Sequence, residues 1–265
     1  MQPRRLEGHE AHEVKLFFFM TPFVLLLVLA ASLAGAGPAV NSPPRLMLWA
    51  WERPEDLRFL DPGTTGVAYL AKTLYLTAGR AVSRPRLQPL RMPPGTFVTA
   101  VVRIESDTTR HTAAQRASIV DAIAVLAAKK DVSAVQVDFD AAVSERAFYS
   151  AVISDLHRRL PQQKPLSITA LASWCSGDRW MAELPLAEAV PMLFRMGPDG
   201  AQILQSLKRG KDFAEPLCRN SIGVSTDEPA APFLHTRRVY AFHPKPWTAD
   251  AVQPFIRTLE PESAP

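Results

Sequence analysis

Two aspartates, Asp138 and Asp140, stand two residues apart in the stretch AVQVDFDA at residues 134–141. Two carboxyl groups held close together can divide their roles, because one keeps a proton to donate while the other stays ionised as a base or nucleophile. Cleavage of a glycosidic bond needs such a pair. The stretch otherwise reads as a buried strand, so the fold must decide what surrounds the two acids.

Strand geometry groups these acids with other polar side chains. Alternate residues of a strand share a face, so Asp138 and Asp140 point one way and the apolar residues between them point the other. The same test on residues 97–105 puts Arg103 and Glu105 together on a polar face. A charge inside a fold needs a partner, so this pattern predicts either a ligand site or a structural polar network.

The candidate site gathers groups from the ends of several predicted strands. We expect the proton donor to be Asp140, followed by Glu105, with Asp138 or Glu52 as the second carboxylate. Aromatic rings beside carboxylates suit the faces of sugar rings, although each tryptophan could equally seal the core. The expected ligand-binding residues are Trp49, Trp51, Arg103, Trp174, Asp178, Trp180, Arg195 and His243.

Eight short apolar runs alternate with helical patterns along the chain. The runs are residues 46–51, 66–71, 97–105, 134–140, 165–173, 189–196, 221–226 and 238–243. This alternation predicts parallel strands joined by crossovers, and eight units predict an α/β protein with a (β/α)8 TIM barrel. Active sites of such barrels lie at the carboxyl ends of the strands. Residues 72–96 hold prolines and no helical period, so we expect the second helix to be replaced by a hairpin and loop.

Two helices between strands carry start signals. Thr112 and Gln115 have the spacing of a capping box at the start of the helix that follows the third strand. Ser144 is expected to cap the next helix, which Pro161 ends.

The amino-terminal segment predicts export. Basic residues precede a strongly apolar run at residues 16–37 that ends in small residues. Residues 1–37 therefore read as a signal peptide or as an uncleaved signal anchor, the only expected contact with a membrane. Residues 38–45 form a Pro-rich linker, residues 46–258 the barrel and residues 259–265 a disordered tail. The barrel should then lie in the periplasm or outside the cell.

The two cysteines are expected to be free thiols. Cys175 follows a predicted strand and Cys218 precedes one, which would place them at opposite ends of a barrel. An exported location would nevertheless permit a disulfide.

Charge and motifs disfavour several other functions. The net charge of +4 includes Arg80, Arg84, Arg86 and Arg91 in one stretch, which reads as a solvated loop or as a contact for an anionic partner. No nucleic-acid motif accompanies them, so we expect no nucleic-acid partner. The sequence has no H-E-x-x-H, C-x-x-C or G-x-S-x-G motif, so we expect no metal and no cofactor.

Longer strings carry a family resemblance. The run VQVDFDAAVSERAFYSAVISDLHRRLP, with LSITALASWCSGDRW, EAVPMLFRMGPDG, CRNSIGVSTDEP and LMLWAWERPEDL, resembles a bacterial family of exported proteins known as domain of unknown function 3142. The resemblance covers about residues 44–248. It implies a TIM barrel similar to glycoside hydrolases.

A more distant similarity concerns the central acids. QVDFD is similar to the D-x-x-D-x-D-x-E strand of chitinase-like barrels, with Asp138 at the last aspartate and Asp140 at the final glutamate. Ser133 and Gln136 stand where that pattern has its other aspartates. The sequence therefore predicts a monomer that binds and hydrolyses a polysaccharide. The alternative is a carbohydrate-binding or envelope interaction module without catalysis.

Overall fold

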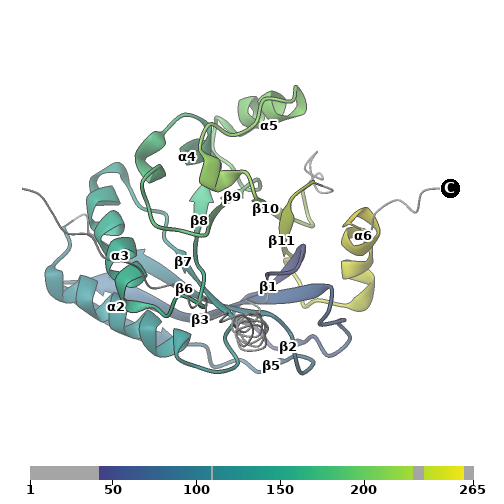
Figure 1. Ribbon diagram of the computed structural model, residues 1–265, viewed down its shortest axis with the longest axis horizontal. Coiled ribbons are helices and arrows are strands. Elements are labelled where there is room, and N and C mark those ends of the chain that lie inside the picture. The colour runs from purple at the N-terminus through teal and green to yellow at the C-terminus, as the bar shows by residue number, and fades with distance from the viewer. Residues whose placement is uncertain (1–41, 109, 229–235, 260–265) are drawn as a thin grey trace, which may run out of the picture. The chain divides into compact units, whose positions relative to one another are not determined.

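The computed structural model describes residues 42–108, 110–228 and 236–259 (Figure 1). The predicted export segment lies outside these residues, as do residues 38–41 of the predicted linker and the tail beyond Leu259. Within the described residues, no helix has both the length and the apolar character needed to cross a membrane. The chain divides into Met1–Val40 and Asn41–Pro265, and the description below concerns the second unit.

Eight parallel strands of the described chain form a closed ring. They follow each other around it as β1 (Leu46–Ala50), β3 (Thr65–Thr77), β6 (Val98–Ser106), β7 (Ala134–Asp138), β8 (Leu166–Leu171), β9 (Glu188–Met192), β10 (Ser221–Ser225) and β11 (Arg238–Phe242). Pairing of β11 with β1 closes the ring. Each strand matches one of the eight predicted runs, so the prediction of a TIM barrel is confirmed.

A hairpin stands in place of the second helix, as the prolines predicted. After β3 the chain turns at Ala78 and Gly79, both with positive φ, and returns as the antiparallel strand β4 (Arg80–Pro85). The left-handed conformation at two successive residues is what a tight hairpin turn requires. Further along, β5 (Leu90–Arg91) pairs with β2 (Glu55–Asp56) in a separate small sheet.

Helices surround the ring on its outer side (Figure 1). They are α2 (Ala113–Ala127), α3 (Arg146–Arg159), α4 (Ala172–Ser176), α5 (Gly200–Lys208) and α6 (Ala249–Leu259), with short 3-10 turns η2 (Val143–Glu145), η3 (Arg179–Met181) and η4 (Pro216–Cys218). The capping box of Thr112 and Gln115 is present at the start of α2. The predicted cap Ser144 is wrong, because η2 precedes α3 and the residue at the cap position is Glu145.

The barrel has one apolar cluster on the outer face of its sheet and another on the inner face. The outer cluster packs strand residues such as Val135 and Val137 against helix residues such as Ile119 and Ile123. The inner cluster contains Met47, Trp49, Ala68, Phe97, Val101, Ala134, Val190 and Tyr240. Alternate strand residues therefore fill the two clusters, as the period of two predicts.

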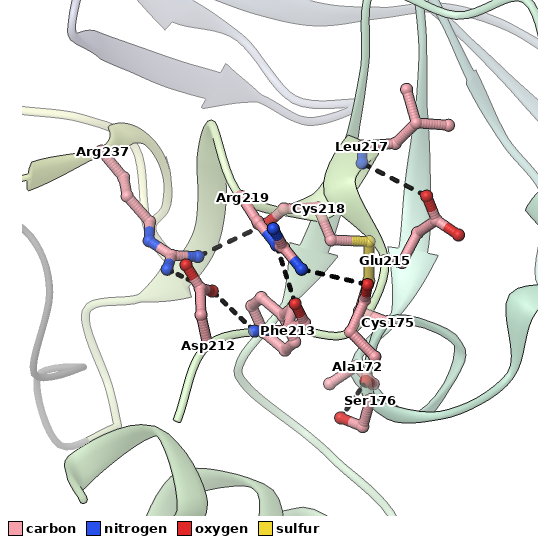
Figure 2. Close-up of a disulfide and its surroundings, with 11 residues drawn as sticks. Ala172, Cys175, Ser176, Asp212, Phe213, Glu215, Leu217, Cys218, Arg219 and Arg237 are labelled. Carbon is pink, nitrogen blue, oxygen red and sulfur yellow. Dashed lines mark hydrogen bonds and ion pairs between the residues drawn. A yellow bond between two sulfur atoms is a disulfide. The ribbon is translucent and has the colours of Figure 1, made fainter. Parts of the chain in front are cut away.

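The cysteines form a disulfide, so the prediction of two free thiols is wrong. The Cα atoms of Cys175 and Cys218 are 5.9 Å apart. Cys175 lies on α4, outside the ring, and the segment that leads from α5 to β10 passes beside this helix, where the Glu215 amide donates to the Cys175 carbonyl at 3.2 Å (Figure 2). The order of strands along the chain predicts at which end of the barrel a residue next to a strand lies. It does not predict the path of a loop on the outside of the barrel, which decides whether two cysteines meet.

Arginines hold the same segment in place. Arg219 donates to the carbonyl of Phe213 at 2.8 Å, and Arg237 pairs with Asp212 at 2.6 Å (Figure 2). The disulfide is therefore one of several contacts that fasten the outer segment between α5 and β10.

Removing the disulfide should destabilise the protein. The bridge spans 43 residues of sequence, and a loop of that size corresponds to about 4 kcal/mol in the chain-entropy model. We expect the Cys175→Ser/Cys218→Ser variant to unfold at a lower urea concentration than the oxidised protein. Ser176→Ala, next to the bridge on an exposed position, is the matched control. Equal urea midpoints for the double variant and the oxidised protein would contradict a stabilising bridge.

Candidate active site

The candidate site lies at the mouth of the barrel, defined here as the carboxyl end of its eight strands. Asp138 is the last residue of β7 and is buried. Thr169 of β8 donates its hydroxyl to one carboxylate oxygen of Asp138 at 2.7 Å. The guanidinium of Arg103, on β6, donates to the other oxygen at 3.3 Å. Arg103 on β6 and Thr169 on β8 point into the barrel, because the residues on either side of each belong to the outer cluster.

Burial governs the ionisation of Asp138. The pKa of this carboxyl is raised, chiefly because burial disfavours the charged form. The hydrogen bond from Thr169 and the charge of Arg103 act in the opposite direction, and the negative charge of Asp140 raises the pKa further. Asp138 therefore keeps its proton to a higher pH than an ordinary aspartate does.

Arg103 connects three parts of the mouth. Besides Asp138, it pairs with Glu105 at 2.9 Å and lies over the ring of Trp51, with its Cζ atom 5.5 Å from the ring centroid. Arg103 is partly exposed and the side chain of Glu105 is 43% exposed. The structure thus brings together Arg103, Glu105, Asp138 and Trp51. Strand parity predicts that the first three share the inner face, but it does not predict the contact with Trp51.

Asp140 lies beyond the end of β7 and is exposed. Among the described residues it has no hydrogen bond or ion pair, in contrast to Asp138. The two acids are therefore neighbours with different environments. One is buried and held, and the other is open to solvent.

Aromatic rings cross the mouth from β1 to the end of β9. The ring centroids of Trp51 and Phe242 are 6.3 Å apart, and those of Phe242 and Phe194 are 5.7 Å apart with nearly parallel planes. Trp49 lies below, 5.9 Å from Trp51. We call Trp51, Phe242 and Phe194 the aromatic strip. The sequence reasoning did not include Phe242 or Phe194, although the inward parity of Tyr240 on the same strand indicates Phe242.

Arg195 reaches the aromatic strip through an unusual backbone conformation. Its φ of 49° lies in the left-handed region, which non-glycine residues seldom adopt. The guanidinium lies 5.6 Å from the centroid of the Phe242 ring and 3.7 Å from the carboxylate of Asp227. The backbone amide of Arg195 donates a hydrogen bond to the carboxylate of Glu228 at 2.8 Å. Strain of this kind collects at functional sites.

Glu52 and His243 occupy the rim of the mouth. Glu52 pairs with Arg84 of β4 at 3.5 Å. The Nδ1 atom of His243 lies 2.5 Å from the hydroxyl of Thr226, and its ring packs on Trp247. Burial and the nearby charge of Arg53 lower the pKa of His243. Because Val239 and Ala241 of the same strand belong to the outer cluster, His243 follows the outward parity rather than the inward one.

Three predicted ligand-binding residues lie away from the mouth. Trp174 is buried in the outer cluster and meets Trp180 edge to face, with their ring centroids 5.1 Å apart. Trp180 also contacts Tyr149 and lies beneath Arg146 of α3. Asp178 pairs with the same arginine at 2.5 Å. The reason is local: α4 begins directly after β8, so residues from 172 onward leave the sheet and pack on the outside.

No metal centre is visible among the residues that the structure describes. Residues 42–108, 110–228 and 236–259 hold no group of three or more His, Cys, Asp or Glu side chains that could bind a metal ion.

Replacing Asp138 should reveal its raised pKa. A raised pKa stabilises the folded state below the ordinary value of 3.8, and that stabilisation is lost as the pH rises through the folded-state value. We therefore expect the free energy of unfolding of the parent, minus that of Asp138→Asn, to fall as the pH rises above 3.8. Urea unfolding at a series of pH values measures this difference.

In the control for this experiment, the difference in free energy of unfolding between parent and variant should change with pH in the opposite direction. A hydrogen bond from Arg58 lowers the pKa of the exposed Asp56 to about 2. The same difference for Asp56→Asn should therefore rise between about pH 2 and pH 3.8, if it changes measurably. A difference for Asp138→Asn that stays constant or rises with pH would contradict the burial of an acid at this position.

Comparison with known proteins gives a family model that covers part of the candidate site. No curated protein matches the chain. Among solved structures, it is similar to the spore cortex-lytic enzyme SleL of Bacillus cereus, with 17% identity and a TM-score of 0.46 over 69% of this chain and 52% of that one. The chain thus spans about half the length of that enzyme. Residues 94–215 match the family model described as Domain of unknown function (DUF3142). Arg103, Asp138 and Asp140 all lie in these matched residues.

Proposed function

We propose that the mouth of the barrel binds a polysaccharide and hydrolyses one of its glycosidic bonds. The observation that supports this most is the contrast between the two acids at the end of β7. Asp138 is buried with a raised pKa, and Asp140 is exposed without an ion-pair partner in the described chain. Cleavage of a glycosidic bond by two carboxyl groups requires acids in different environments, one that donates a proton and one that is ionised.

The two acids are proposed to take different roles. Burial raises the pKa of Asp138, so this acid keeps its proton to a higher pH than an ordinary aspartate does. Asp138 is covered by Arg103 and Thr169, so Asp140 is the member that reaches the ligand. As the proposed proton donor, Asp140 gives a proton to the leaving oxygen as the bond from that oxygen to the anomeric carbon breaks. A water molecule then adds to this carbon, and the proton that the water loses returns to Asp140.

The aromatic strip supports the choice of a sugar ligand. Trp51, Phe242 and Phe194 are partly exposed aromatic rings, and Arg103 and Arg195 lie over two of them. A sugar presents an apolar ring face and hydroxyl groups that charged side chains can bond. The strip and the acids meet at Arg103, which contacts both.

A second function is favoured by the ion pairs of the mouth. Arg103 pairs with Glu105 and Asp138, and Arg84 pairs with Glu52. Of the four predicted catalytic acids, Asp140 is thus the one without an ion pair among the described residues. Acids that are saturated by arginines can hold a ligand without cutting it. The alternative is therefore a carbohydrate-binding or envelope interaction module.

The disulfide supports the proposal that the protein works outside the cytoplasm, in the periplasm or beyond the cell. Disulfides form and persist in oxidising compartments and are rare in the cytosol. Cys175 and Cys218 are both fully buried and joined.

Replacing Asp140 should separate the two candidate functions. We expect the parent to release new reducing ends from at least one polysaccharide in a panel, and Asp140→Asn to release them about 100- to 10,000-fold more slowly. The loss of a proton donor with the side-chain shape retained is the reason. Asp121→Asn, an exposed acid on α2, is the control and should match the parent.

Two other outcomes would count against hydrolysis. If the parent releases nothing but one polysaccharide raises its melting temperature, the binding module replaces the enzyme. If no polysaccharide is cleaved or bound, both functions are contradicted.

A further inference from the structure

Strands β3 and β6 continue beyond the mouth. Strand β1 ends at Ala50, opposite Tyr69 of β3, and β7 ends at Asp138, opposite Arg103 of β6. Beyond these points β3 runs on to Thr77, and β4 takes the place of β1 beside it. We call residues 70–77 of β3, β4, and residues 103–106 of β6 the hairpin wall. It is a three-stranded sheet that stands beside the mouth.

The hairpin wall has a buried side and a side that faces the mouth. Leu74, Leu76 and Ile104 belong to the outer cluster, which contains the core side chains of α2. The residues of opposite parity continue the inner face of the barrel. On that face Tyr75 stands between Val82 of β4 and Glu105 of β6 in one row.

A second row lies closer to the barrel. Arg84 of β4, Thr73 of β3 and Arg103 of β6 stand side by side, and Asp138 follows on β7. The row of Tyr75 is therefore one step further from the barrel than the row that holds the candidate acid Asp138. Residues of adjacent strands in register have side chains close enough to act on one ligand.

Contacts fix the hairpin wall relative to the aromatic strip. The side chain of Arg84 reaches Glu52, the residue after Trp51, at 3.5 Å. The guanidinium of Arg86 donates to the carbonyl groups of Trp51 and Arg53. Arg86, one of four arginines in a stretch with no acidic residue, thus has a structural role in joining the hairpin to the end of β1.

The side that faces the mouth offers groups suited to a sugar. The ring of Tyr75 is partly buried, and exposed fractions are 57% for the side chain of Arg84 and 43% for that of Glu105. An aromatic ring can lie against a sugar face, while a guanidinium and a carboxylate can bond its hydroxyl groups. This is the same combination that the aromatic strip and its arginines present at the mouth.

We infer that the hairpin wall is a second sugar-binding surface, so that the ligand is a chain of several sugars extending from the aromatic strip along Tyr75 and Arg84. The inference rests on the proposed function and names its substrate class as an extended polymer rather than a single terminal sugar. Trp51 would bind the sugar at the mouth, and Tyr75 a sugar further along the chain.

The test measures affinity against ligand length. Calorimetric titrations would use chito- and cello-oligosaccharides from the disaccharide to the hexasaccharide, with the purified parent, Tyr75→Ala and Arg84→Ala. For the series that binds, the parent should bind the hexasaccharide more tightly than the disaccharide. Each variant should bind the disaccharide as the parent does and the hexasaccharide roughly three- to tenfold more weakly, the scale of one lost aromatic contact.

A matched control is Arg91→Ala, an exposed arginine on β5, which should follow the parent at every length. Arg84→Ala keeps the test valid if Tyr75→Ala does not fold, because Arg84 is largely exposed. The inference would be overturned if the affinity of the parent did not change with ligand length. It would also be overturned if both variants gained as much affinity from disaccharide to hexasaccharide as the parent does. Either result would leave the proposed function standing. A parent that binds neither series at any length would count against the proposed function itself.

Discussion

The guanidinium of Arg103 is the group around which the mouth is organised. A charge at the inner face of a barrel must be paired, because removing an ion from water costs several kcal/mol. Removing one partner of a buried ion pair destabilises a protein by about 3–5 kcal/mol. Arg103 meets this constraint by pairing with Asp138 and Glu105 and by lying over the ring of Trp51. The position of the buried acid, the orientation of the exposed Glu105 and the start of the aromatic strip all follow from this one side chain. Asp140 needs no such partner, because it lies past the end of β7 and its side chain is exposed to solvent.

Unequal strand lengths give the mouth a second property. In a regular barrel each strand would end near the same level and the next helix would begin there. Here the helix after β3 is replaced by β4, so β3 and β6 can continue as a sheet whose other side is covered by α2. The prolines that exclude a helix from residues 72–96 are therefore linked to the surface proposed for an extended ligand. Arg86 completes the arrangement by bonding the hairpin to the backbone at Trp51.

The sequence predicted the barrel and the inward groups, because both depend on short-range periodicity. Parity within strands correctly grouped Arg103 with Glu105 and placed Asp138 on the inner face. The alternation of side chains no longer predicts their direction beyond the end of a strand. The wrong or missing predictions described next concern residues in such positions. Trp174 and Trp180 follow β8 but lie in the outer core, because α4 starts without a loop. Arg195 turns toward Phe242 through a positive φ that no sequence pattern indicates. The disulfide depends on the path of an outer segment, which strand order does not determine.

A crystal structure with a bound oligosaccharide is the most direct test of whether a sugar chain binds across the aromatic strip with a glycosidic bond at Asp140. We expect a sugar ring against Trp51 or Phe242 and a glycosidic oxygen within hydrogen-bond distance of the Asp140 carboxylate, about 2.6–3.2 Å. An oligosaccharide bound elsewhere, for example in the cavity of about 300 Å³ between α4 and α5, would contradict the account. So would a sugar at the mouth whose glycosidic oxygens all lie beyond the reach of Asp140.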